Sequence, residues 1–109
     1  KIKISILAPV PHFSGHIPLT MYKKINDDEI SLSRKEHINM TKGFWNFIEK
    51  ISSDEVLIYD PSKTLCLNKK SCSYKDIDQT PLYYDSNHLT LTGASKLAPL
   101  FQKIINDIK

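Results

Sequence analysis

The chain has 109 residues, of which 40% are hydrophobic and 25% charged, an ordinary balance for a soluble globular fold. Its formal net charge is +3, with 15 basic residues scattered among 12 acidic ones, so the composition does not favour nucleic-acid binding. No apolar run approaches the ~20 residues that a membrane-spanning helix needs.

The first segment, Lys1–Pro9, alternates polar and apolar residues and then becomes continuously apolar, which predicts a strand in a sheet covered on both faces. Because this strand begins at the first residue, we expect the chain to be part of a longer sequence. Pro9 and Pro11 end the strand, since proline has no backbone donor for the ladder. Residues 12–32 predict an irregular surface loop with a short helix near Leu19–Ile25.

The next predicted element is a helix that begins near Ser33, where Ser33 and Glu36 have the spacing of a capping box. We expect His37 to be exposed on this helix, and the aromatic residues that follow it to pack in the core rather than stack on a ligand. The residues at helical spacing along the expected buried face are Ile38, Thr41, Phe44, Trp45, Ile48 and Ile51, and Phe47 completes the aromatic group.

A second strand is predicted at Glu55–Asp60, and a last helix with Thr92 as its N-cap and a kink at Pro99. Strands that alternate with helices favour a parallel sheet with helices on its faces. Two strands are too few for a stable sheet, so we expect the others to come from sequence outside this chain. The buried stripe of the last helix is predicted to comprise Ala94, Leu97, Ala98, Phe101, Ile104, Ile105 and Ile108.

Cys66 and Cys72 flank a short polar stretch that reads as a loop or hairpin. One interpretation is a disulfide, which would stabilise the fold by about 2 kcal/mol in an oxidising compartment. The other is a pair of reduced thiols in a cytosolic protein. A metal site is disfavoured because no second Cys or His pair lies close in sequence. His12 and His16 are interpreted as loop histidines, so we expect neither a metal nor a cofactor.

Asp85 and His88 are three residues apart in a loop that precedes a helix. In a tight turn this spacing lets the carboxylate meet one imidazole nitrogen and leaves the other nitrogen free to act as a general base. A bare Asp-x-x-His pattern is weak evidence, because the two residues often occur at this spacing on loop surfaces. The residues around the pair therefore decide its interpretation.

The run Asp85-x-x-His88-Leu-Thr-x-x-Gly93-Ala94 closely resembles the last motif of SGNH hydrolases. It looks most like the version in the periplasmic domain attached to acyltransferase-3 membrane proteins, which O-acetylate cell-surface glycans. The resemblance covers roughly residues 4–101, and its other parts are Ile4–Pro11, Ser31–His37, Val56–Pro61, the Leu65-Cys66 to Cys72 stretch and Pro81–Asp85.

The resemblance implies a three-layer α/β/α flavodoxin-like SGNH fold with a parallel sheet, of which residues 1–109 are the C-terminal portion. It implies that His88 is the general base for a serine nucleophile and that Asp85 orients it. It agrees with a Cys66–Cys72 disulfide and with a periplasmic domain tethered to the inner membrane through its parent protein. The implied partners are a glycan acceptor, such as the O-antigen of lipopolysaccharide, and an acyl donor delivered by an integral membrane acyltransferase domain.

The family's Gly-Asp-Ser nucleophile motif and its oxyanion-hole residues do not occur in this sequence. We therefore expect them in a missing N-terminal portion, on the same or a second chain, and we expect this portion alone to be inactive. The chain does not distinguish an acyltransferase from an esterase. One alternative is a non-catalytic glycan-binding domain that has lost the serine, with loop residues such as Tyr83, Tyr84 and those in 12–30 on its binding face. Another is an unrelated α/β domain.

Overall fold

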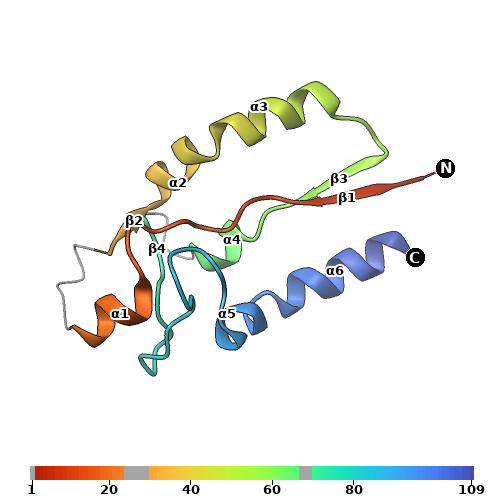
Figure 1. Cartoon of the computed structure of the whole chain (residues 1–109). Helices are drawn as coiled ribbons and strands as arrows, with labels where there is room; N and C mark the ends of the chain where they lie inside the picture. The colour runs from red at the N-terminus through yellow and green to blue at the C-terminus, as the bar shows by residue number, and fades with distance from the viewer. Residues whose placement is uncertain (1, 24–29, 67–69) are drawn as a thin grey trace.

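The computed structural model describes residues 2–23, 30–66 and 70–109. Two parallel strands, β1 (Ile4–Leu7) and β3 (Val56–Tyr59), lie side by side over their full lengths. Figure 1 shows α3 (Lys42–Ile51) on one side of this pair and α6 (Ala98–Ile108) on the other. Both predicted strands are present with shorter bounds, and the predicted α/β class with a parallel sheet is confirmed.

A second, short pair of strands was not predicted. β2 (Leu32–Ser33) runs antiparallel to β4 (Ser71–Cys72), with Leu32 opposite Cys72. Strands of two residues carry no periodic signal, so sequence patterns cannot reveal them. The pair ties the start of the following helix to the cysteine segment.

The capping box predicted at Ser33 is confirmed at the start of α2 (Arg34–Met40). The Ser33 Oγ accepts from the backbone N–H of Glu36 at 2.9 Å, and the Glu36 carboxylate accepts from the backbone N–H of Ser33 at 3.0 Å. The single long helix predicted beyond this point is wrong, because α2 ends at Met40 and α3 begins at Lys42, with Thr41 between them. The Thr41 hydroxyl donates to the carbonyl of His37 at 2.9 Å, a side-chain bond that competes with regular helix geometry.

The region predicted as an irregular surface loop instead contributes much of the core. Its helix, α1 (Ile17–Tyr22), begins two residues earlier than predicted, and the end of the predicted helix lies outside the described residues. Phe13 and Ile17 are almost completely buried against the segment that precedes the last helices. The buried cluster comprises Phe13, Ile17, Ile30, Leu32, Cys66, Cys72, Leu82 and Tyr83.

The C-terminal region forms two helices rather than one kinked helix. These are α5 (Leu91–Ser95) and α6, and α5 has Thr90 rather than the predicted Thr92 as its N-cap. Earlier in the chain, the short helix α4 (Ser62–Leu65) follows β3. Pro99 lies in the first turn of α6, where its missing N–H leaves no helical bond unmade, so the predicted kink is wrong.

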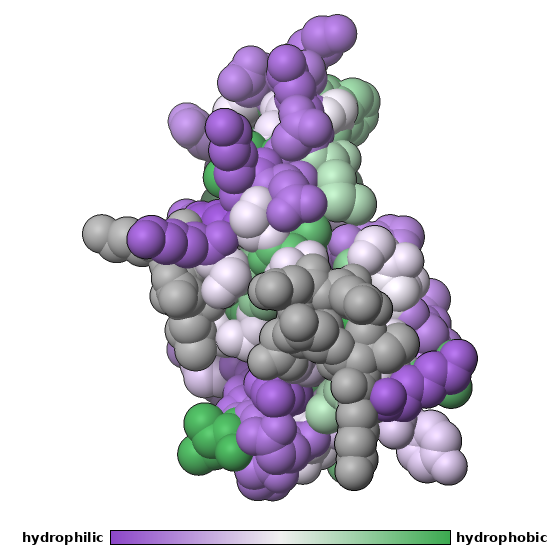
Figure 2. Space-filling view, turned by 90° about the vertical axis from the view of Figure 1, so that its left-hand side faces the viewer, coloured by the Kyte–Doolittle hydropathy of each residue, from purple (hydrophilic) through white to green (hydrophobic). Residues whose placement is uncertain are grey.

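Several apolar residues that were expected to be buried are exposed. On α6, Phe101, Ile105 and Ile108 are exposed, and on α3 the Phe47 side chain is 56% exposed. The two-stranded sheet is too narrow to cover these side chains, so the predicted buried stripe and aromatic core are wrong for these residues. Figure 2 shows the side of the molecule on which α1 and β2 lie, where most of the coloured residues are hydrophilic.

Candidate active site

Asp85 and His88 form a tight turn in the loop before α5. The Asp85 Oδ1 accepts from the backbone N–H of Asn87 at 2.9 Å and from that of His88 at 2.7 Å. The Asp85 Oδ2 lies 2.7 Å from Nδ1 of the His88 ring. One carboxylate therefore shapes the turn and holds the imidazole, and the structure brings the two residues together as their spacing predicted.

The electrostatics of the turn keep this carboxylate ionised. The two backbone N–H groups of Asn87 and His88, together with the His88 ring, lower the pKa of Asp85 to about 2. Since an ionised carboxylate only accepts hydrogen bonds, Nδ1 of His88 carries the proton in this contact. A neutral His88 ring then has its lone pair on Nε2, the nitrogen that a general base uses.

The His88 ring is held from one side and open on the other. The ring of Tyr84 stacks on it with the two centroids 5.6 Å apart and an interplanar angle of 20°. The backbone N–H of Tyr84 donates to the carbonyl of His88 at 2.9 Å, which closes the turn. The His88 side chain is 61% exposed, and its Nε2 has no hydrogen-bond partner among the described residues. The nitrogen is therefore available to a group outside this part of the chain.

The turn is anchored to the segment that follows β1. The backbone N–H of Phe13 donates to the carbonyl of Ser86 at 2.8 Å, and the N–H of Ile17 donates to the carbonyl of Asp85 at 3.2 Å. The Nε2 of His12 lies 3.3 Å from the Ser86 hydroxyl oxygen. Sequence analysis missed these anchors, because no sequence pattern links residues 12–17 to residues 85–86.

The ring of Tyr83 belongs to the buried core, whereas the ring of Tyr84 is exposed. The Tyr83 ring packs edge-to-face on Phe13 with the centroids 5.1 Å apart and is completely buried. Its hydroxyl has no hydrogen-bond partner among the residues described, and burial raises the pKa of Tyr83 well above its usual range. The alternative that placed Tyr83 on a binding face is therefore wrong for this residue, whereas Tyr84 is exposed.

The rest of the motif has a structural explanation. The Thr90 hydroxyl donates to the carbonyl of Pro81 at 2.8 Å and accepts from the backbone N–H of Gly93 at 3.1 Å, so Thr90 caps α5 and ties it to the preceding segment. A Cβ at Gly93 would collide with the carbonyl oxygen of Leu82 and would lie 3.0 Å from a methyl carbon of Leu89. The close approach of α5 to this segment therefore requires glycine at position 93.

The two cysteines form a disulfide within the core cluster, with both residues almost completely buried. Of the interpretations that the sequence left open, the structure therefore shows the disulfide. Cys72 is part of β4 and lies opposite Leu32 of β2, and both cysteines belong to the buried cluster that includes Leu82 and Tyr83. The role of the disulfide in this structure is to hold the core on which the turn rests.

Two other histidines, His16 and His37, have structural environments that differ from that of His88. The Nδ1 of His16 accepts from the backbone N–H of Leu19 at 3.1 Å and so caps α1. His37, predicted to be exposed, is only 4% exposed, and that prediction is wrong. His37 lies on the side of α2 that faces the cavity lined by Val10 and His12, and helical periodicity alone did not place His37 on that side. Within the described ranges, no group of three or more His, Cys, Asp or Glu residues is placed to hold a metal ion.

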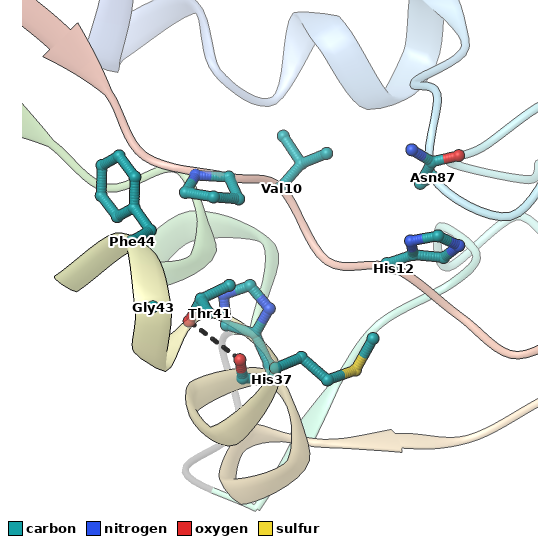
Figure 3. A pocket seen from close by; sticks show the side chains of 9 residues that line it. Val10, His12, His37, Thr41, Gly43, Phe44 and Asn87 are labelled. Carbon is teal, nitrogen blue, oxygen red and sulfur yellow. Dashed lines mark hydrogen bonds between the residues drawn. The ribbon is translucent and has the colours of Figure 1, made fainter. Parts of the chain in front are cut away.

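A cavity of about 440 Å³ opens beside the turn, between the segment after β1 and the junction of α2 and α3 (Figure 3). His37 and Thr41 line it from the helices, Val10 and His12 from the opposite segment, and Asn87 from the turn itself. Because Asn87 directly precedes His88, the cavity adjoins the candidate active site. Sequence analysis did not identify it.

The fold and the site together define an α/β domain that carries a hydrogen-bonded Asp–His pair on the loop before a C-terminal helix. A family model described as "SGNH domain (fused to AT3 domains)" matches residues 1–103 of the chain. The chain therefore belongs to the SGNH domain family, as its sequence motifs predicted. The searches of curated proteins and of solved structures gave no significant match.

The family description states that such domains are fused to AT3 domains. Among the helices that the structure describes, none is long and apolar enough to cross a bilayer.

Proposed function

We propose that this chain supplies the His-Asp half of a Ser-His-Asp acyl-transfer site in an extracytoplasmic SGNH domain. The observation that carries the proposal is the contact between Asp85 and Nδ1 of His88, which leaves Nε2 open. In this reaction Nε2 removes the proton from a serine hydroxyl as the serine oxygen attacks an acyl ester. Asp85 stabilises the imidazolium that results, and His88 then returns the proton to the departing alkoxide.

The second half of the reaction uses the same two residues. Nε2 of His88 accepts the proton of an incoming hydroxyl as the oxygen of that hydroxyl attacks the acyl-enzyme. The bond to the serine oxygen then breaks, and His88 gives the proton to that oxygen. We infer that the group transferred is acetyl and that the incoming hydroxyl belongs to a bacterial cell-surface polysaccharide. Membership in a family fused to AT3 domains supports this acceptor and a membrane domain as the source of the acyl group.

We infer that the serine and its oxyanion hole belong to a portion of the same domain outside residues 1–109. The exposed apolar side chains of Ile4 and Leu7 on β1 support this inference, because two strands are too few for a stable sheet and a wider sheet with helices on its faces would cover them. The exposed stripe of α6, formed by Phe101, Ile105 and Ile108, supports it in the same way.

The test is labelling of the longest protein that contains this chain with a fluorophosphonate probe, followed by peptide mapping. We expect one labelled serine outside residues 1–109, and we expect His88→Ala to abolish its labelling. Asn39→Ala, an exposed change on α2, is the control and should label as the wild type does. Absence of labelling in the folded protein would refute the triad and favour the glycan-binding alternative.

A further inference from the structure

The wall of the cavity beside the candidate active site includes His37, a polar side chain without a hydrogen-bond partner among the described residues. His37 is 4% exposed and lines the cavity, yet its ring makes no hydrogen bond to any residue that the structure describes. Figure 3 shows its ring rising from the α2–α3 junction toward the segment that carries Val10. Among the described residues, the Tyr83 hydroxyl is the buried side-chain polar atom that lacks a partner, so the unpaired ring nitrogens of His37 are open to the cavity, where an incoming polar group can pair with them.

The environment of His37 favours its uncharged form. Burial lowers the pKa of His37, the Asp60 carboxylate opposes this shift, and the Arg34 guanidinium reinforces it. A neutral imidazole offers one N–H donor and one acceptor nitrogen. The ring therefore suits a hydroxyl group, which both donates and accepts, better than it suits an anion.

The rest of the wall combines polar and apolar groups. Asn87 contributes an amide whose NH₂ has no partner among the described residues, and His12 contributes a second imidazole. Val10 and the half-buried ring of Phe44 supply apolar surface. A sugar ring has hydroxyls at its edge and C–H groups on its faces, and so matches such a wall. The volume, about 440 Å³, lies in the usual range of small-molecule sites.

We propose that this cavity is the acceptor subsite, and that it binds one sugar unit of the polysaccharide by hydrogen bonds to His37 and Asn87. The position of Asn87, directly before His88, puts a sugar bound there next to the loop that carries the general base. The proposal rests on the acyl-transfer function proposed above and adds the residues that hold the acceptor.

Binding is tested without an acyl donor, by NMR titration of the protein containing this chain with methyl glycosides of glucose, galactose, rhamnose and N-acetylglucosamine. We expect at least one glycoside to shift the His37 ring resonances at saturable concentrations. His37→Leu should weaken that binding about tenfold, the value for loss of one buried hydrogen bond with its partner left unpaired. The matched control, Asn39→Ala on the exposed side of the same helix, should bind as the wild type does.

Three results would overturn the proposal. These are the absence of any shift at His37 with all four glycosides, unchanged affinity in His37→Leu, and a shift produced by p-nitrophenyl acetate but by no glycoside, which would make the cavity a donor site. If His37→Leu does not fold, Asn87→Ala takes its place with the same expected loss of affinity. Failure of the acyl-transfer function itself is recognised separately, because fluorophosphonate labelling requires no acceptor.

Discussion

One carboxylate oxygen of Asp85 lies 2.7 Å from Nδ1 of His88, and its other oxygen accepts the backbone N–H groups of Asn87 and His88. The residue therefore has two separable roles, one in shaping the turn and one in orienting the imidazole. An amide at position 85 could keep the first role through its oxygen. It would lose the second, because its NH₂ group would face the Nδ1 proton.

We expect Asp85→Asn to leave the fold intact and to lower activity by roughly 10³-fold to 10⁴-fold, as the wrong His88 tautomer is favoured. The measurement is kcat/KM for hydrolysis of p-nitrophenyl acetate by the intact protein. Asp54→Asn makes the same chemical change at an exposed position away from the turn and should retain wild-type activity. Equal activity of Asp85→Asn and wild type would rule out an orienting role for Asp85.

The low pKa of Asp85 predicts how stability depends on pH. The backbone N–H groups of Asn87 and His88 are the main cause of its shift from 3.8 to about 2. A carboxyl group with a lowered pKa in the folded state adds stability above its unfolded pKa. That contribution is lost as the pH falls through the folded value. We therefore expect the stability advantage of wild type over Asp85→Asn to shrink between about pH 4 and about pH 2.

Urea unfolding of both proteins across this range measures the difference in free energy of unfolding at each pH. NMR titration of the Asp85 carboxyl carbon gives its pKa directly. A stability difference that does not change with pH, or a titration midpoint near 4, would contradict the hydrogen bonds that hold this carboxylate.

Two glycines of this chain are expected to respond oppositely to the same substitution. At Gly93 a Cβ would collide with the carbonyl of Leu82, so Gly93→Ala should destabilise the fold by about 1–3 kcal/mol. At Gly43, in α3, an added Cβ would meet no described atom within 4 Å beyond its chain neighbours and the backbone of its own helix, so Gly43→Ala should stabilise by about 1 kcal/mol. Thermal or urea unfolding of the pair measures both effects, and destabilisation by Gly43→Ala would contradict the open environment of that position.

Much of the local structure could be predicted from the sequence, because its signals are local. The strands at Ile4–Leu7 and Val56–Tyr59 follow from apolar runs, and the start of α2 follows from the spacing of Ser33 and Glu36. The Asp85–His88 contact follows from a spacing that a single turn can close. In each case the interacting groups are separated by few residues or share one periodic pattern.

The remaining features depend on contacts between distant segments. His37 is buried on the side of α2 that faces the cavity next to the segment after β1, and the sequence of its own helix does not distinguish this side from the others. Phe13 lies in a stretch without periodicity, and its burial depends on Tyr83, which is far from it in sequence. Phe101 is exposed because the two-stranded sheet is too narrow to cover the whole apolar face of α6, and helical periodicity does not specify the width of the sheet.

The disulfide is expected to support the site through the core rather than through catalysis. Both Cys66 and Cys72 belong to the buried cluster that includes Leu82 and Tyr83, the residues just before the turn. Replacing both cysteines with alanine should lower the free energy of unfolding by about 2 kcal/mol. Urea unfolding with and without a thiol reductant measures the effect, and the alanine protein, which has no bond to break, should not respond to the reductant.

Tyr84 is expected to increase the rate of acyl transfer through the stacking of its ring on the His88 ring. The two rings lie nearly parallel with centroids 5.6 Å apart, so the face of the tyrosine ring is placed to stabilise the imidazolium formed during acyl transfer. A contact of this kind at an exposed site contributes about 0.5–1 kcal/mol, which corresponds to roughly a twofold to fivefold change in rate. Tyr84→Leu should therefore lower kcat/KM by that factor, whereas Tyr84→Phe, which keeps the ring, should not. An equal loss in both variants would assign the effect to the hydroxyl, and no loss in either would show that the stack does not contribute to catalysis.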